Sequence, residues 1–138
     1  MSDDPYVIEA IQKYSQALSE FNKVTVEEVE KIIRKSPSKS CDLDPLPTWL
    51  LKECLHELSP IITDLINISM SCAHVNQEMK EAIVTPLLKK INLELILKNF
   101  RPVSNLSFIS KTIERVVASQ LSHHMKINGL IEVFQSGF

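Results

Sequence analysis

Three cations at the ends of two short apolar segments are the strongest candidates for binding an anionic ligand in this sequence. Lys89 and Lys90 close the segment 82–90, and Arg101 lies near the start of the segment 99–106. Lysine offers phosphate oxygens a mobile point charge, and arginine offers them a planar fork of donors. If the two segments pair as a hairpin, the three cations lie near one surface, which suits a polyphosphate or a nucleic-acid backbone. The alternative is solvated charge at the ends of strands.

The distribution of charge favours the same part of the chain as a contact for anions. The 138 residues carry a net charge of −2, but residues 80–126 hold eight Lys/Arg and three acidic residues. The remaining residues hold seven Lys/Arg and fourteen acidic residues. A basic segment in an acidic chain indicates either an anionic partner or packing between oppositely charged parts.

Glycine-rich phosphate loops are excluded by the composition. The sequence contains two glycines, Gly129 and Gly137, and neither GxGxxG nor GxxxxGK[ST] occurs. Such loops need residues that adopt positive φ and let backbone N–H groups approach the phosphate.

Other potential ligands and nucleophiles are poorly spaced for a site. They are the C-x-H pairs Cys54/His56 and Cys72/His74, the neighbours His123-His124, and the aspartate pairs Asp3-Asp4 and Asp42/Asp44. A C-x-H pair on a helix points its side chains about 200° apart, whereas zinc sites use spacings such as C-x2-C. The second aspartate pair lies directly before Pro45, where turn and cap roles are typical. We predict no metal site and no catalytic residue in this chain.

Hydrophobic periodicity predicts a series of helices before the two cationic segments. A helix is expected from Pro5, and Thr25 with Glu28 forms a capping box for a second one. Residues 44–58 are predicted as a third helix, and Ser59-Pro60 as the cap of a fourth.

The cations themselves are expected on a hairpin that precedes a last helix. Segments 82–90 and 99–106 contain apolar and β-branched residues, among them Ile83, Val84 and Val103, so we predict an antiparallel pair, with Pro86 and Pro102 at unpaired positions. Ser107 should cap a long C-terminal helix. The predicted fold class is α+β and predominantly α-helical, with N-terminal helices, one antiparallel β-hairpin and a long C-terminal helix.

The sequence also predicts an intracellular protein without a membrane partner. No apolar run approaches the ~20 residues of a membrane span, and the polar N-terminus is not a signal peptide. Three cysteines, an odd number, favour reduced thiols.

Several motifs, in their order and spacing, resemble the reverse transcriptases of non-LTR (LINE-type) retrotransposons over roughly residues 20–138. They are Lys39-Ser40-Cys41-Asp42-Leu43-Asp44-Pro45-Leu46-Pro47-Thr48, Trp49-Leu50-Leu51-Lys52, Thr85-Pro86-Leu87-Leu88-Lys89-Lys90, Asn99-Phe100-Arg101-Pro102-Val103-Ser104-Asn105-Leu106, Ile109-Ser110-Lys111-Thr112-Ile113-Glu114 and Gln135-Ser136-Gly137-Phe138. The chain departs from the family at Ala73-His74-Val75-Asn76, where Gly-x-Val/Phe-Pro is common, and at Ile91, where a proline often follows the twin lysines.

The resemblance implies part of a right-hand RNA-directed DNA polymerase. Residues 1–40 would be a helical N-terminal extension, and residues 41–138 a partial reverse transcriptase domain with pre-fingers and fingers but no palm. Catalysis in the family needs palm aspartates, including a Tyr/Phe-x-Asp-Asp motif that binds two metal ions, and this motif is absent from the 138 residues. The resemblance therefore implies a fragment that is inactive alone, with no cofactor of its own and Mg²⁺ only in the full-length enzyme.

The resemblance also assigns roles to individual residues. Lys89 or Lys90, together with Arg101, would grip the triphosphate of the incoming dNTP. The segment around Ser104 and Asn105, and the stretch with Gln135 and Gly137, would lie near the template and primer. The expected partner is nucleic acid, RNA or DNA, bound weakly.

Two other interpretations compete with this one. The chain could be a small helical protein-interaction module without catalytic activity, or a free-standing nucleic-acid-binding domain built on the basic segment. Salt-dependent binding of RNA or DNA that maps to residues 80–126 would distinguish the last from the first.

Overall fold

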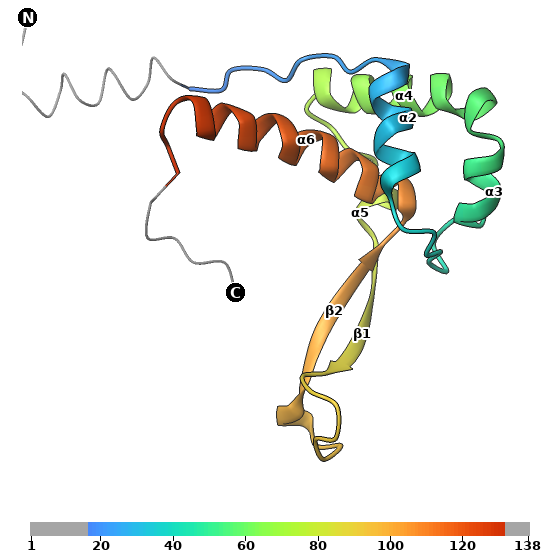
Figure 1. Ribbon diagram of the computed structural model, residues 1–138, viewed down its shortest axis with the longest axis vertical. Coiled ribbons are helices and arrows are strands. Elements are labelled where there is room, and N and C mark those ends of the chain that lie inside the picture. The colour runs from blue at the N-terminus through green and yellow to red at the C-terminus, as the bar shows by residue number, and fades with distance from the viewer. Residues whose placement is uncertain (1–16, 132–138) are drawn as a thin grey trace, which may run out of the picture. The chain divides into compact units, whose positions relative to one another are not determined.

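The computed structural model describes residues 17–131, and the fold within them is α+β and mainly helical (Figure 1). Its elements are the helices α2 (Val26–Lys35), α3 (Thr48–Glu53), α4 (Leu55–Ser71) and α5 (Gln77–Lys80), the strand β1 (Ala82–Leu88), a 3-10 turn (Leu97–Asn99), the strand β2 (Phe100–Leu106) and the helix α6 (Phe108–Ile127). The predicted fold class is therefore confirmed. The helix predicted from Pro5 lies outside the described residues.

The capping box predicted for α2 is formed. The Thr25 hydroxyl accepts a hydrogen bond from the Glu28 backbone N–H at 3.2 Å, and the Glu28 carboxylate accepts one from the Thr25 backbone N–H at 2.9 Å. Val29 and Ile33 share one side of the helix and are fully buried, and α2 packs against α4. At the other end, Lys52 donates to the carbonyl of Ser36 at 2.5 Å, where a cation complements the helix dipole.

The predicted boundary between the third and fourth helices is wrong. Helix α3 ends at Glu53, Cys54 separates the two helices, and α4 begins at Leu55 and continues through Pro60. Ser59 caps nothing: it is fully buried, and its hydroxyl donates to the carboxylate of Glu30 on α2 at 2.8 Å. This contact between helices outweighs the local Ser-Pro signal. Pro60 itself is exposed, so the helical bond that its missing N–H would have made is lost at the surface.

The predicted hairpin is present and its register is complete. β1 pairs antiparallel with β2, from Ala82 opposite Leu106 to Leu88 opposite Phe100. The Lys89 backbone N–H donates to the Asn99 carbonyl at 2.9 Å, and bonded and non-bonded pairs alternate along an antiparallel ladder. Counting back from this bond, Pro86 and Pro102 face each other in a non-bonded pair, so neither removes a ladder bond, as predicted.

An aspartate and a serine fix the start of α6. Ser107 accepts from the Ser110 backbone N–H at 3.3 Å, the predicted cap. The Asp44 carboxylate accepts from the Phe108 backbone N–H at 2.5 Å and from the Cys41 backbone N–H at 2.6 Å. A carboxylate at the first N–H groups of a helix is favourable, and here it also ties the loop 37–47 to the end of the hairpin.

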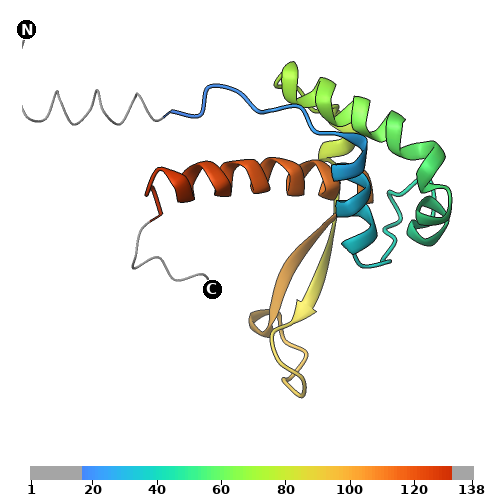
Figure 2. The same cartoon turned by 45° about the horizontal axis from the view of Figure 1, so that its top comes forward.

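The chain forms two compact units. One comprises residues 23–116, and the described part of the other comprises residues 17–22 and 117–131. Within the first unit the hairpin extends away from α2, α3 and α4 (Figures 1 and 2). In the second, Asn22 and Gln120 exchange two hydrogen bonds of 2.8 Å. The division at residue 40 that the resemblance implies stays a prediction, and α2 packs in the same unit as α4.

Candidate nucleic-acid interface

The register of the hairpin places two of the three predicted cations on one face. Arg101 lies opposite Leu87, and Lys89 follows Leu87 by two residues and pairs with Asn99 through its backbone. Side chains two residues apart on a strand share a face, so Arg101 and Lys89 are diagonal neighbours across the ladder. Diagonal neighbours lie about 7–8 Å apart, within reach of long side chains. The two cations can therefore meet the same phosphate group or adjacent ones.

No carboxylate neutralises these cations in the part of the chain that the structure describes. The ion pair within 4.0 Å there joins Arg34 and Glu30, both on α2. The Lys89 ammonium donates to the Lys98 carbonyl at 2.8 Å, which leaves two of its three donors for a ligand. Lys90 and Arg101 are exposed and make no such bond. These side chains therefore present positive charge to solvent.

A polar cavity lies at the base of the hairpin, next to the helices. It has a volume of about 260 Å³. Its walls come from loop 37–47, both strands and α6, and are formed by Lys39, Ser40, Cys41, Asp42, Ile83, Thr85, Asn105 and Lys111. We call it the base cavity. Ile83, Thr85 and Asn105 belong to the same hairpin face as Arg101, so this face runs from the cations into the cavity.

Hydrogen bonds made by loop 37–47, within itself and to β2 and α3, hold the wall of the base cavity in place. The Cys41 backbone N–H is held by Asp44, and the Cys41 thiol donates to the Asn105 carbonyl at 3.7 Å. The Ser40 hydroxyl accepts from the Thr48 backbone N–H at 2.8 Å. Asp44 thus has the cap and turn role predicted for the second aspartate pair, and its carboxylate serves structure.

Sequence reasoning missed the two lysines of the base cavity. Lys39 lies in the loop before α3 and Lys111 on the first turns of α6. Their approach depends on the tertiary fold, and no local spacing could have shown it. Of these two lysines, only Lys111 lies in the basic segment 80–126 that the sequence indicated as a contact for anions.

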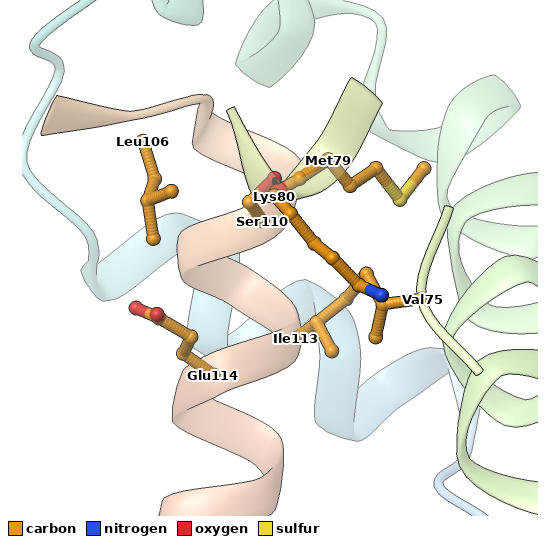
Figure 3. Close-up of a pocket in the computed structure, with 7 residues that line it drawn as sticks. All are labelled: Val75, Met79, Lys80, Leu106, Ser110, Ile113 and Glu114. Atoms are coloured by element: carbon orange, nitrogen blue, oxygen red, sulfur yellow. Dashed lines mark hydrogen bonds between the residues drawn. The ribbon is translucent and has the colours of Figure 1, made fainter. Parts of the chain in front are cut away.

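A second cavity, of about 320 Å³, is mainly apolar (Figure 3). Val75, Met79 and Lys80 come from α5 and the segment before it, Leu106 from β2, and Ser110, Ile113 and Glu114 from α6. The Ser110 hydroxyl is engaged by the Met79 carbonyl at 2.7 Å. This cavity can receive an apolar group, with Lys80 and Glu114 as the charged residues of its lining.

The residues that the resemblance places near template and primer have mixed positions. Asn105 is half-buried and lines the base cavity, whereas Ser104 is exposed on the other face of β2. Gln135 and Gly137 lie outside the described residues.

Metal chemistry finds no support in the described residues. No group of three His, Cys, Asp or Glu side chains converges there. They do not provide the carboxylates that a pair of Mg²⁺ ions would need. The cysteines at 41, 54 and 72 are free thiols.

Among the carboxyl groups of residues 17–131, that of Glu30 on α2 has a shifted pKa. The hydrogen bond from Ser59, and then the neighbouring Arg34 guanidinium, lower the pKa of Glu30, against the opposing effect of desolvation. This carboxylate joins α2 to α4 and has no place in the candidate interface.

No protein-family model, curated protein or solved structure matches this chain. Among residues 17–131, no helix is both long and apolar enough to cross a membrane.

Proposed function

We propose that this chain is the fingers-containing part of a reverse transcriptase of the non-LTR retrotransposon type, and that its hairpin binds the phosphate groups of a nucleic acid or an incoming nucleotide. The support from sequence is the ordered set of motifs between Lys39 and Phe138. The observation that carries the proposal is the hairpin itself, because its register brings Lys89 and Arg101 to one exposed face with no carboxylate partner.

The proposed contact is electrostatic and independent of base sequence. Lysine and arginine at the hairpin would replace counterions on the phosphates, so log K should fall linearly with log salt, by about 0.7 per phosphate on a single strand. The described surface offers the bases few partners for stacking. Aromatic residues form 6% of the chain, and Phe100, the aromatic residue of the hairpin strands, is half-buried.

A polypeptide of these 138 residues should not polymerise. Phosphoryl transfer by the family uses two metal ions held by aspartates, and no Tyr/Phe-x-Asp-Asp motif occurs in the sequence. The function proposed for the chain is binding, and catalysis belongs to a palm.

Fluorescence anisotropy with a labelled single-stranded RNA, titrated at several salt concentrations, tests the proposal. The triple variant K89A/K90A/R101A should bind at least tenfold more weakly at low salt and show a salt slope lower by about 1–2. The matched control is K23A/K31A/K35A, which removes the same charge from exposed positions in or before α2. Its affinity should fall much less, and only through the change in net charge.

Equal affinities for the two triple variants would refute the proposed interface. The helical interaction module would then be the better account. An exposed apolar set on the helices would be its surface, formed by Trp49, Ile61 and Ile68, with 56%, 66% and 61% of their areas accessible.

A further inference from the structure

The base cavity gathers polar groups from four separate parts of the first unit. Lys39 and Lys111 supply ammonium groups, Ser40 and Thr85 hydroxyls, and Asn105 an amide. Loop 37–47 and α6 are tied to each other by Asp44, and the loop is tied to β2 by Cys41. The lining is therefore held in place before any ligand arrives, which lowers the entropic cost of binding.

The two lysines have no acceptor within hydrogen-bond distance. Lys111 is half-buried and Lys39 exposed. Their backbones make hydrogen bonds with Ser107 and Thr48, but neither ammonium group takes part in a hydrogen bond or ion pair among the described residues. Lys52, by contrast, uses its ammonium to hold the end of α2. Two cations at one cavity with no structural partner are available to an anion.

The volume of the base cavity favours a small phosphate-bearing group over a whole nucleotide. At about 260 Å³ it lies just below the range of roughly 300–1,000 Å³ that is typical of pockets for whole small molecules. A phosphate with part of its sugar fits such a volume better than a nucleoside triphosphate. The cavity also continues the hairpin face of Arg101 and Lys89, so a strand bound to those cations can extend into it.

Asp42 should oppose phosphate binding in the base cavity, so its removal should have the opposite effect to removal of the lysines. Its carboxylate also lines the cavity and is exposed, so it opposes the two lysines and leaves one net positive charge. A phosphate in the cavity would be repelled by this carboxylate. Removing the Asp42 charge should therefore strengthen binding, whereas removing the lysines should weaken it.

We infer that the base cavity is a second phosphate site, which takes one phosphodiester of a nucleic-acid backbone between Lys39 and Lys111. The inference rests on the proposed function, since it extends the same hairpin face, but it concerns residues that the proposed contact does not use. Together the two sites define a track along one face of the hairpin, from the cations near its tip to the cavity at its base.

The experiment compares two variants of opposite expected effect by RNA anisotropy at several salt concentrations. K39Q/K111Q should weaken binding of a single-stranded RNA about fivefold at low salt and lower the salt slope by about 0.7, the value for one lost phosphate. D42N should tighten binding about twofold, because it removes the repulsion between the Asp42 carboxylate and the phosphate. The effect is small because the carboxylate is exposed and water screens its charge. Circular dichroism and thermal melting of both variants verify that the fold is retained.

Controls match each change in charge away from the cavity. K31Q/K35Q removes two lysines from α2, and D64N removes one exposed aspartate from α4. Each control should move the affinity in the same direction but by less than half as much. If the cavity variants behave like their controls, the second phosphate site is refuted, and the hairpin contact is judged separately by K89A/K90A/R101A.

A dNTP titration distinguishes the two sources of phosphate. K39Q/K111Q should leave dNTP affinity unchanged. Loss of dNTP binding with RNA binding intact would overturn the assignment to a nucleic-acid backbone. Loss of RNA binding in K39Q/K111Q but not in K89A/K90A/R101A would uphold the cavity and refute the hairpin contact.

Discussion

Ala73 occupies a backbone conformation that costs the protein stability. It follows α4 with φ of 50°, in the left-handed region that favours glycine. Two hydrogen bonds close the end of the helix around it: His74 N–H to the Ser69 carbonyl at 3.0 Å and Ala73 N–H to the Met70 carbonyl at 3.3 Å. This is the Schellman pattern, in which glycine is the usual residue.

Replacing Ala73 by glycine should therefore stabilise the protein. Relief of the left-handed conformation returns about 1–2 kcal/mol, and the greater freedom of glycine in the unfolded chain takes back about 0.4–1 kcal/mol. Ala73 is exposed, so little buried methyl area is lost. The expected net gain is about 0.5–1 kcal/mol, which corresponds to a rise in Tm of about 2–4 °C for a chain of this length.

Urea unfolding followed by circular dichroism and by the fluorescence of the single tryptophan, Trp49, measures this change. The matched control is Ala118→Gly, at an exposed position inside α6, where the same substitution should cost about 1 kcal/mol. Opposite signs for the two variants support the conformational explanation. A destabilised A73G protein would show that the helix end is not held as described.

Three further changes follow from contacts of the first unit. Asp44→Ala should destabilise by about 2–3 kcal/mol, because two backbone N–H groups lose a charged acceptor, and urea unfolding checks it. Ser59→Ala should raise the pKa of Glu30 towards its ordinary value, since the Ser59 hydrogen bond is the largest cause of its lowering. The ionised Glu30 stabilises the fold above the ordinary carboxyl pKa, and this contribution is lost as pH falls through the lowered value, so the stability gap between wild type and variant should close in acid. Replacing Pro86 and Pro102 by valine should leave the ladder intact but add an unpaired N–H group to each outer edge of the hairpin, where another chain could pair. Sedimentation velocity should then show more self-association, and a variant that stays monomeric would contradict a protective role of the two prolines.

The hairpin could be predicted from the sequence because its signals are local and agree with one another. Segment 82–90 contains the β-branched run Ile83-Val84-Thr85, segment 99–106 contains Phe100 and Val103, polar residues separate the two segments, and both prolines fit positions of the ladder that donate no bond. The observed strands are one or two residues shorter at their inner ends. The capping box at Thr25 could be predicted for the same reason, because its hydrogen bonds join residues within a span of four.

The start of α4 could not be predicted, because the residue that decides it is distant in sequence. Ser59-Pro60 is a good local helix start, but the Ser59 side chain is taken by Glu30 of another helix. The candidate site divides in the same way. The juxtaposition of Lys89 and Arg101 follows from strand register alone, whereas the approach of Lys39 to Lys111 needs loop 37–47 to be fastened to α6 by Asp44.

The hairpin is supported differently at its tip and at its base, and this difference should separate the roles of the two sets of cations. A two-stranded hairpin is at best marginally stable on its own, and most side chains of β1 are exposed, as are Ile91, Leu95 and Leu97 beyond it. Cys41 and Asp44 secure only the end of the hairpin next to α6. Cations near the tip must therefore be ordered when a phosphate binds, and this ordering cost offsets part of the electrostatic gain. The lysines of the base cavity sit on the secured end and lose less. We accordingly expect the hairpin cations to contribute most of the salt slope and of the rate of association, and the base cavity to contribute a comparable affinity per cation at a smaller salt slope.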